Sequence, residues 1–271
     1  MPEVAARAHA LGTAPFVQPT LVASDIGMTF GVEDGRPVEV IRSISFSLAR
    51  GEIVSIVGPS GCGKTTLLNL VCGLLPPTRG AVLWHGRELA GVPARAGYML
   101  QKDLLFPWRT AIENVALGLQ VKGMDKRQRM ERARELLSQL GLEQFTQYYP
   151  SALSGGMRQR VALARTLAPE PEVLLLDEPF SALDFQTKIL IERDTARLIR
   201  AEGRSLLLIT HDVEEAVSLS DRVIVLSHRP CTVVAEHRID LPIDRTQMIE
   251  ARETREFAQY VRAIWTELNV L

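Results

Sequence analysis

One glycine-rich stretch constrains this chain of 271 residues more than any other part of its sequence. It fits the pattern G-x-x-x-x-G-K-[ST] and reads Gly58-Pro59-Ser60-Gly61-Cys62-Gly63-Lys64-Thr65-Thr66. An apolar run over residues 53–57 precedes it, and a helix-like run over residues 66–72 follows. This strand–loop–helix context predicts a P-loop, because successive backbone N–H groups and the positive end of the following helix form a cradle for phosphate groups. A glycine-rich turn without a ligand is the alternative interpretation.

The end of this stretch and a distant acidic pair together predict a nucleotide site with Mg²⁺. We expect Lys64 to reach the β- and γ-phosphates and the Thr65 hydroxyl to hold the metal. Such a site also needs a strand-end carboxylate for Mg²⁺. Asp177 follows four apolar residues, 173–176, which are typical of a strand buried on both faces. Glu178 comes next and is the candidate general base for an attacking water, although a plain acidic pair at a helix start would read the same way.

Three further residues are candidates for the same site. Gln101 and His211 each follow a strand-like run, which predicts that both point toward the γ-phosphate. Gln101 could join the Mg²⁺ shell or the water network, and His211 could donate to a γ-phosphate oxygen in the transition state. Taken alone, each is more often an ordinary polar loop residue. Phe30 ends a strand-like run, so its ring either belongs to the core or stacks on a nucleotide base.

Strand-like and helix-like runs alternate around the P-loop, which predicts a mostly parallel α/β core with nucleotide at the carboxyl ends of the strands. A stripe of apolar residues at helical spacing near the C-terminus predicts a helix packed on its own domain, with a dimer or partner contact as the alternative; the stripe is Phe257, Val261, Ile264 and Leu268. The strands are expected at 21–24, 27–30, 38–48, 52–57, 80–84, 97–100, 173–176, 205–209, 222–226 and 232–237. Helices are expected at 66–72, 111–119, 126–140, 186–201, 213–219 and from about 247.

Charge and composition narrow the class of partner. The net charge is −1, so bulk electrostatics gives no reason to expect a nucleic-acid partner. Cys62, Cys72 and Cys231 are scattered and form no C-x-x-C pair, which argues against a disulfide framework or a zinc site and favours a reducing, cytoplasmic compartment. No run approaches 18 apolar residues, so we expect any work at a membrane to go through a partner. Residues 1–19 are interpreted as a flexible extension without the features of a secretory signal.

At this point the chain resembles a known family. The run Leu153-Ser154-Gly155-Gly156 is similar to the signature motif of ATP-binding-cassette (ABC) proteins. The resemblance covers about residues 20–240 and rests on an ordered set: Phe30, the P-loop at 58–65, Gln101, the signature at 153–157, Asp177-Glu178, Ser181-Ala182-Leu183-Asp184 and His211. It implies an α/β P-loop NTPase fold with a RecA-like, mostly parallel core, an antiparallel β subdomain and a helical subdomain inserted at about 102–165. A helical tail at 241–271 follows the cassette.

The resemblance also implies how the cassette works. Ser154, Gly155 and Gly156 open a helix and form a second anion cradle, which faces the γ-phosphate of an ATP bound by another copy. ATP would thus join a two-fold dimer with two composite sites. Asp184 is carried over as a nucleotide-site residue. Met157 departs from the commonest family residue, Gln, and we expect little effect on ATP chemistry.

The run from Leu104 to Val115 resembles the nitrate, sulfonate and taurine importer group. One cassette without a membrane domain fits the importer pattern, which implies permease subunits docked near Leu104–Trp108, an indirect link to a solute-binding protein, and a peripheral place on the cytoplasmic side of the inner membrane. The alternative for Leu105, Phe106 and Trp108 is that they fill the core of the helical subdomain. An exporter or lipid-transport cassette is a second reading. A non-transport ABC protein is a third, although those usually carry two cassettes or long coiled coils.

Overall fold

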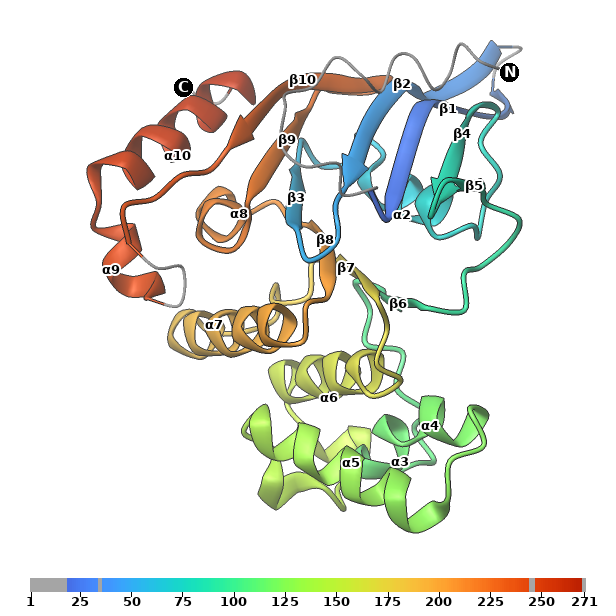
Figure 1. The fold of residues 1–271 in the computed structure, drawn as a ribbon, viewed down its shortest axis with the longest axis vertical. Coiled ribbons are helices and arrows are strands. Elements are labelled where there is room, and N and C mark those ends of the chain that lie inside the picture. The colour runs from blue at the N-terminus through green and yellow to red at the C-terminus, as the bar shows by residue number, and fades with distance from the viewer. Residues whose placement is uncertain (1–18, 34–35, 244–246, 270–271) are drawn as a thin grey trace.

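The computed structural model describes residues 19–33, 36–243 and 247–269, so the extension expected at residues 1–19 lies almost wholly outside the described residues. Strands and helices alternate in the order that the sequence predicted, and Figure 1 shows their arrangement. The strands are β1 (Leu21–Glu33), β2 (Arg36–Leu48), β3 (Ile53–Val57), β4 (Arg79–Trp84), β5 (Arg87–Glu88), β6 (Ala96–Met99), β7 (Val173–Asp177), β8 (Ser205–Ile209), β9 (Arg222–Leu226) and β10 (Cys231–Arg238). Within the described residues they form one sheet in the order β5-β4-β1-β2-β10-β9-β3-β8-β7-β6.

Half of this sheet is parallel and carries the candidate site. Strands β9, β3, β8, β7 and β6 are neighbours in that order, and each adjacent pair is parallel. Every residue of β3, β7 and β8 is buried, because helices cover both faces of the sheet there. The predicted parallel α/β core, with a fully buried strand before Asp177, is therefore confirmed.

The other half is antiparallel, with β1 between β2 and β4. The sequence predicted two short strands at 21–24 and 27–30, and the structure has one strand instead. The pairing of β1 shifts register between Ala23 and Ile26, and Asp25 has a φ of 47°, so a bulge interrupts the alternation without ending the strand. Strand β10 joins the two halves because it pairs with β9 antiparallel and with β2 parallel.

The helices are α2 (Lys64–Val71), α3 (Ala111–Val115), α4 (Leu117–Val121), α5 (Lys126–Gln139), α6 (Gly155–Leu167), α7 (Phe185–Ala201), α8 (Val213–Leu219), α9 (Met248–Arg252) and α10 (Arg255–Glu267). Apart from α2, they gather in two places. Helices α3, α4 and α5, and the signature helix α6, lie beyond the β6–β7 edge in Figure 1, while α7 to α10 flank the parallel strands. The single helix expected at 111–119 is two helices that meet at Ala116. Two 3₁₀ turns lie between α5 and α6, at Glu143–Phe145 and Pro150–Ala152.

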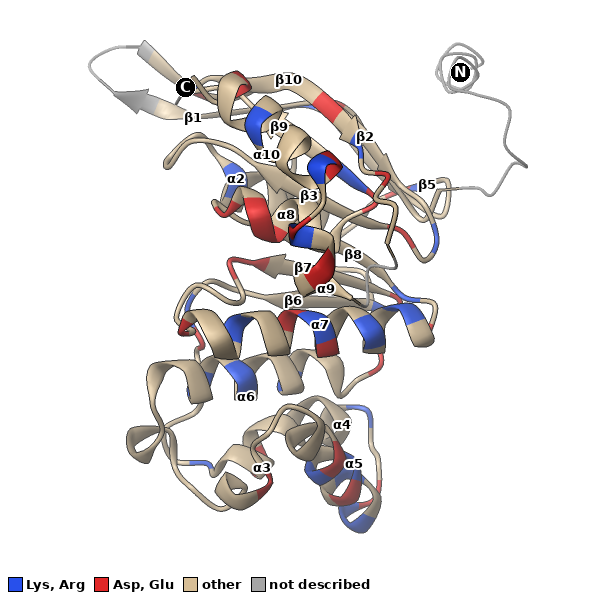
Figure 2. Cartoon of the chain, turned by 90° about the vertical axis from the view of Figure 1, so that its left-hand side faces the viewer, with Lys and Arg blue, Asp and Glu red and all other residues tan. Residues whose placement is uncertain are grey.

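The C-terminal helix α10 packs on its own domain, as predicted. Phe257 and Ile264 are buried in a cluster with residues of α8 and β9, and Val261 and Leu268 pack against the same cluster. None of the helices in the described part of the chain combines the length and apolar character needed to cross a bilayer. In the view of Figure 2, Lys and Arg are interspersed with Asp and Glu along the helices.

Candidate functional site

The glycine-rich loop lies at the carboxyl edge of the parallel strands. Strand β3 ends at Val57 and α2 begins at Lys64, so the intervening residues turn sharply between them. Gly61 and Gly63 have φ angles of 76° and 120°, a region that L side chains adopt with strain. A Cβ atom on Gly63 would also lie 2.9 Å from Val40 Cγ1. The loop geometry therefore requires glycine at these positions.

Lys64 lies across this loop. Its side chain is largely buried, and its Nζ donates hydrogen bonds to the carbonyl oxygens of Gly58 at 2.8 Å and Pro59 at 2.9 Å. Both carbonyl groups are uncharged, so they do not neutralise the ammonium group. An anion bound in the loop could therefore form a charge-assisted hydrogen bond with Lys64. The exposed Ser60 and the Thr66 backbone, in the first turn of α2, complete the rim of the loop.

Cys62 contributes to the loop through its backbone. The Cys62 side chain is buried and lies against the Cys231 side chain, whose hydrogen bond lowers the pKa of the Cys62 thiol to about 7. The same contact raises the pKa of Cys231, and burial raises it further. The Cys62 N–H donates to the Pro59 carbonyl oxygen at 3.3 Å. The Cys62 side chain is therefore engaged with Cys231, and its N–H group closes a turn within the loop.

Thr65 and Asp177 meet although 112 residues separate them in the chain. The Thr65 hydroxyl donates to Asp177 Oδ2 at 2.7 Å, and Asp177, the last residue of β7, is 2% exposed. Burial raises the pKa of Asp177, and the Thr65 hydrogen bond opposes this rise. The two oxygens are ligands that Mg²⁺ prefers, and Mg²⁺ usually keeps several waters and substrate oxygens besides one or two protein groups. The donor set fits that metal.

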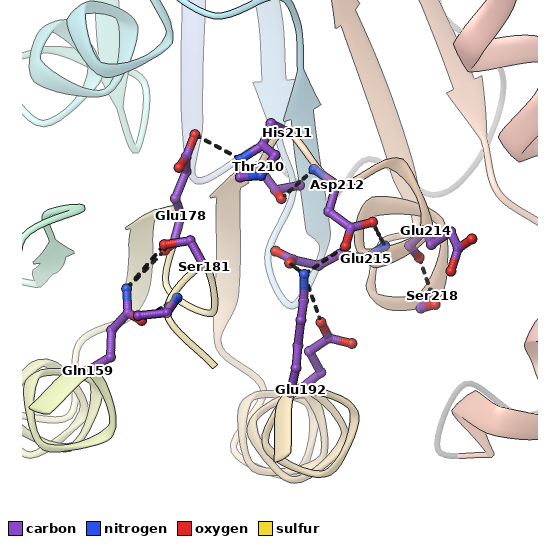
Figure 3. Close-up of polar contacts among 12 residues, drawn as sticks. Gln159, Glu178, Ser181, Glu192, Thr210, His211, Asp212, Glu214, Glu215 and Ser218 are labelled. Atoms are coloured by element: carbon purple, nitrogen blue, oxygen red, sulfur yellow. Dashed lines mark hydrogen bonds and ion pairs between the residues drawn. The ribbon is translucent and has the colours of Figure 1, made fainter. Parts of the chain in front are cut away.

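Glu178 brings two further predicted residues together. Its Oε1 lies 3.2 Å from His211 Nδ1, and its Oε2 accepts a hydrogen bond from Gln101 Nε2 at 2.9 Å. Glu178 has a φ of 49°, and its N–H donates to the Ile209 carbonyl on β8 at 2.8 Å. Figure 3 shows Glu178 and His211 facing one another at the strand ends. A non-glycine residue in this conformation is typical of positions where surrounding structure fixes a functional side chain.

The signature residues lie at the start of α6. Ser154 caps this helix, with its Oγ accepting from the Met157 N–H at 3.2 Å. A Cβ atom on Gly156 would lie 2.9 Å from Leu183 Cδ2, so glycine lets the helix approach the loop that follows Glu178. Within the described residues, no hydrogen bond or ion pair joins Ser154, Gly155 or Gly156 to the glycine-rich loop. The structure thus places this second helix N-terminus apart from the first.

Two other predicted residues have clear places in the structure. Asp184 caps α7, where its Oδ1 accepts from the Thr187 N–H at 3.1 Å, and this bonding lowers the pKa of Asp184. Phe30 lies on β1 with 41% of its surface exposed, so its ring is available for stacking and is not a core residue.

Sequence patterns indicated no role for Gln159, which the structure places against the segment that carries Glu178. Gln159 projects from α6 and is 4% exposed. Its Nε2 donates to the Glu178 carbonyl at 3.2 Å, and its Oε1 accepts from the Ala182 N–H at 2.9 Å. The signal was its position in the run after Gly156, where a polar residue falls on the buried face of the helix. Gln159 thereby fixes the segment that carries the candidate base.

Comparison with known proteins decides the family. The model of the family described as ABC transporter matches residues 41–181, more than half of the chain. The chain belongs to the ABC transporter family. This ABC protein is 44% identical over 240 residues to an uncharacterized ABC transporter ATP-binding protein of Methanocaldococcus jannaschii, covering 88% of this chain and 86% of the relative. It is 42% identical over 234 residues to the taurine import ATP-binding protein TauB of Pseudomonas aeruginosa, covering 86% of this chain and 87% of the relative.

A solved structure gives the same answer at the level of the fold. The ATP-binding cassette MJ0796, in a dimeric post-hydrolysis state bound to ADP and Pi, superposes with a TM-score of 0.75 at 32% identity. The match covers 81% of this chain and 99% of that one. The predicted family and the ABC cassette fold are confirmed. The protein is an ABC ATP-binding subunit that hydrolyses ATP.

Proposed function

We propose that this ABC subunit powers an importer by closing and opening an ATP-dependent dimer of two copies. One observation carries the proposal: Glu178, His211 and Gln101 converge beside the Thr65–Asp177 pair, while no hydrogen bond or ion pair among the described residues joins the signature residues to the glycine-rich loop. A site with a base, a phosphate loop and no second cradle of its own is completed by Ser154–Gly156 of another copy. The dimeric state of the solved cassette supports this geometry.

In the proposed reaction, each residue has one task. Lys64 and the loop N–H groups hold the phosphates, and Thr65 and Asp177 would hold Mg²⁺, which would supply positive charge to the phosphate groups. Glu178 accepts the proton of the attacking water. His211 donates to a γ-phosphate oxygen, and Gln101 orients the water through its bond to Glu178.

The experiment that tests this reaction is Glu178→Gln. The amide has the size of the carboxylate, can accept from Gln101 and can donate to His211, so the contacts persist while the base is lost. We expect kcat to fall about 10²- to 10⁴-fold, with ATP binding retained and an ATP-dependent dimer seen by size-exclusion chromatography with light scattering. The exposed Glu131→Gln on α5 is the control. Hydrolysis at the wild-type rate, or a monomer in ATP, would contradict the proposal.

We further propose that permease subunits dock at the segment from Leu104 to Trp108, which follows Gln101 directly. Leu105 is buried in the core of the helical region, whereas Leu104 and Trp108 are 54% and 69% exposed. The Phe106 and Trp108 rings lie 5.1 Å apart and offer an apolar surface beside the site. The solute is proposed to be a small sulfonate, taurine, nitrate or similar compound, because relatives at about 40% identity are named as taurine import proteins. The subunit would then sit peripherally on the cytoplasmic side of the inner membrane.

Trp108→Ala tests the docking surface. Because the ring is mostly exposed, we expect the melting temperature and basal ATPase of the isolated subunit to stay at wild-type values. In proteoliposomes with the permease, stimulation of ATPase and solute uptake should both fall. A lowered melting temperature with equal loss of basal and stimulated activity would show that Trp108 belongs to the core instead.

A further inference from the structure

A cluster of buried charges lies beside His211, on the far side from Glu178 (Figure 3). At its centre, Lys188 Nζ lies 2.7 Å from Asp212 Oδ2 and 2.6 Å from Glu215 Oε2. The Glu192 carboxylate is 3.7 Å from the same nitrogen and 3.3 Å from Arg252 Nη2. Helices α7, α8 and α9 each contribute to this cluster. None of these residues touches the glycine-rich loop, and the proposed reaction assigns them no task.

The cluster is a costly way to stabilise a fold. Glu192 and Glu215 are 0% and 2% exposed, and one oxygen of each lacks a hydrogen-bond partner. Burial by itself lowers the pKa of Lys188, but the Glu215 and Asp212 carboxylates outweigh burial and raise the pKa above its ordinary value, so the ammonium group stays charged. Buried ion pairs are commonly replaceable by apolar residues without loss of stability. The arrangement therefore points to a geometric requirement.

The geometry shows what the cluster fixes. His211 lies between Thr210 and Asp212, and the Asp212 N–H donates to Thr210 Oγ1 at 3.0 Å. The Asp212 side chain caps α8 through Oδ1, which leaves Oδ2 for Lys188. Lys188, Glu178 and His211 all line one cavity of about 90 Å³. The Lys188 ammonium group thus holds the Asp212 side chain, which belongs to the turn that carries His211.

Lys188 is itself fixed at the other end. It lies in the first turn of α7, where its N–H donates to the Asp184 carbonyl at 2.8 Å. The loop at residues 181–184 lies directly before α7. It carries Leu183, against which Gly156 packs, and Ala182, whose N–H donates to Gln159. The side chain of Lys188 therefore links the first turn of α7, which directly follows the 181–184 loop, to the turn that carries His211.

We propose that Lys188 is a positioning residue for ATP hydrolysis, joining the 181–184 loop to the Asp212 cap of α8 and so setting where His211 meets Glu178. This inference rests on the catalytic roles proposed for Glu178 and His211. Lys188 does not touch the reacting atoms in this arrangement. A displacement of the 181–184 loop reaches His211 through this side chain, so the state of the loop and the state of the site are linked.

The test is Lys188→Met, assayed by steady-state phosphate release over a range of ATP concentrations. Because positional errors of about an ångström cost up to about 100-fold in rate, we expect kcat to fall about 10- to 100-fold. KM for ATP should stay at the wild-type value, since Lys188 lies outside the phosphate loop. Lys188→Arg should recover most of kcat, because a guanidinium group can hold the Asp212 and Glu215 carboxylates together.

Two further variants guard against misfolding. Lys188→Met/Glu215→Gln removes one charge of each sign, so the net charge of the cluster is unchanged while Asp212 still loses its partner; the same loss of kcat is expected. Lys126→Met, at an exposed lysine of α5, is the matched control and should keep the wild-type kcat.

His211→Ala is assayed beside them and separates the two possible failures. If His211→Ala loses activity while Lys188→Met and the double variant keep the wild-type kcat, the positioning role is wrong and the proposed site stands. If His211→Ala keeps the wild-type kcat, the proposed site fails, and the inference falls with it. A rise in KM equal to the fall in kcat, without recovery in Lys188→Arg, would also overturn the positioning role, because it would indicate general structural damage.

Discussion

Replacing Gln159 with leucine tests whether α6 holds the segment that carries Glu178, the proposed base. The leucine matches the size of glutamine but abolishes the bond to the Glu178 carbonyl and the bond from the Ala182 N–H. Each neutral hydrogen bond contributes about 0.5–1.5 kcal/mol, which sums to about 1–3 kcal/mol for the two. At about 2–4 °C per kcal/mol for a domain of this size, the melting temperature should fall by roughly 2–12 °C.

The assay is thermal unfolding by circular dichroism, with ATPase measured on the same samples. Gln139→Leu makes the same chemical change at an exposed position at the end of α5 and should leave the melting temperature at the wild-type value. We also expect kcat to fall in Gln159→Leu, because the Glu178 backbone loses a fixed point in its strained conformation. The reasoning is refuted if Gln159→Leu and Gln139→Leu melt together and hydrolyse ATP equally.

Two other predictions concern stability. Burial, reinforced by the negative charge of Glu215, raises the pKa of Glu192 to about 8. The folded state therefore binds a proton that the unfolded chain has released above its ordinary pKa of 4.5, so this group lowers the unfolding free energy as pH rises from about 5 to about 8. Glu192→Gln should flatten that slope in melting curves recorded across the range, and an identical slope would contradict the assignment. Ile264→Ala should cost about 2–5 kcal/mol, because Ile264 is fully buried in the cluster that joins α10 to α8 and β9; unchanged thermal unfolding would show that α10 does not dock in solution.

Local sequence patterns predicted most of the fold because the relevant forces act over a few residues. The expected strands at 205–209 and 222–226 and the expected helix at 213–219 match β8, β9 and α8 in full. Each is a short apolar or amphipathic run with a turn or capping residue at its ends, such as Asp212 before α8. The predicted element bounds were wrong where contacts with distant parts of the chain shape the local backbone. The bulge at Asp25 lies where β1 pairs with β2 and β4, so it depends on strands from elsewhere in the chain.

The candidate site divides in the same way. The sequence was enough to predict the glycine-rich loop, the strand-end acidic pair and the ordered motifs, because the chemistry of phosphate and Mg²⁺ requires specific residue types at fixed spacing. The sequence did not predict which side chains of the site contact one another. Three such contacts join residues from separate elements: Gln101 with Glu178, Gln159 with the Ala182 N–H, and Lys188 with Asp212.

The sequence alone thus determined that this protein has a phosphate-binding loop, a parallel core and the motifs of an ABC subunit. Only the tertiary structure decided that Lys188 reaches Asp212 and that Gln159 reaches Glu178. The physical reason is that such contacts depend on where the ends of α6, α7 and β8 come to lie. Those positions are set by packing over the whole sheet, whereas periodicity within one segment carries no information about the distance to another.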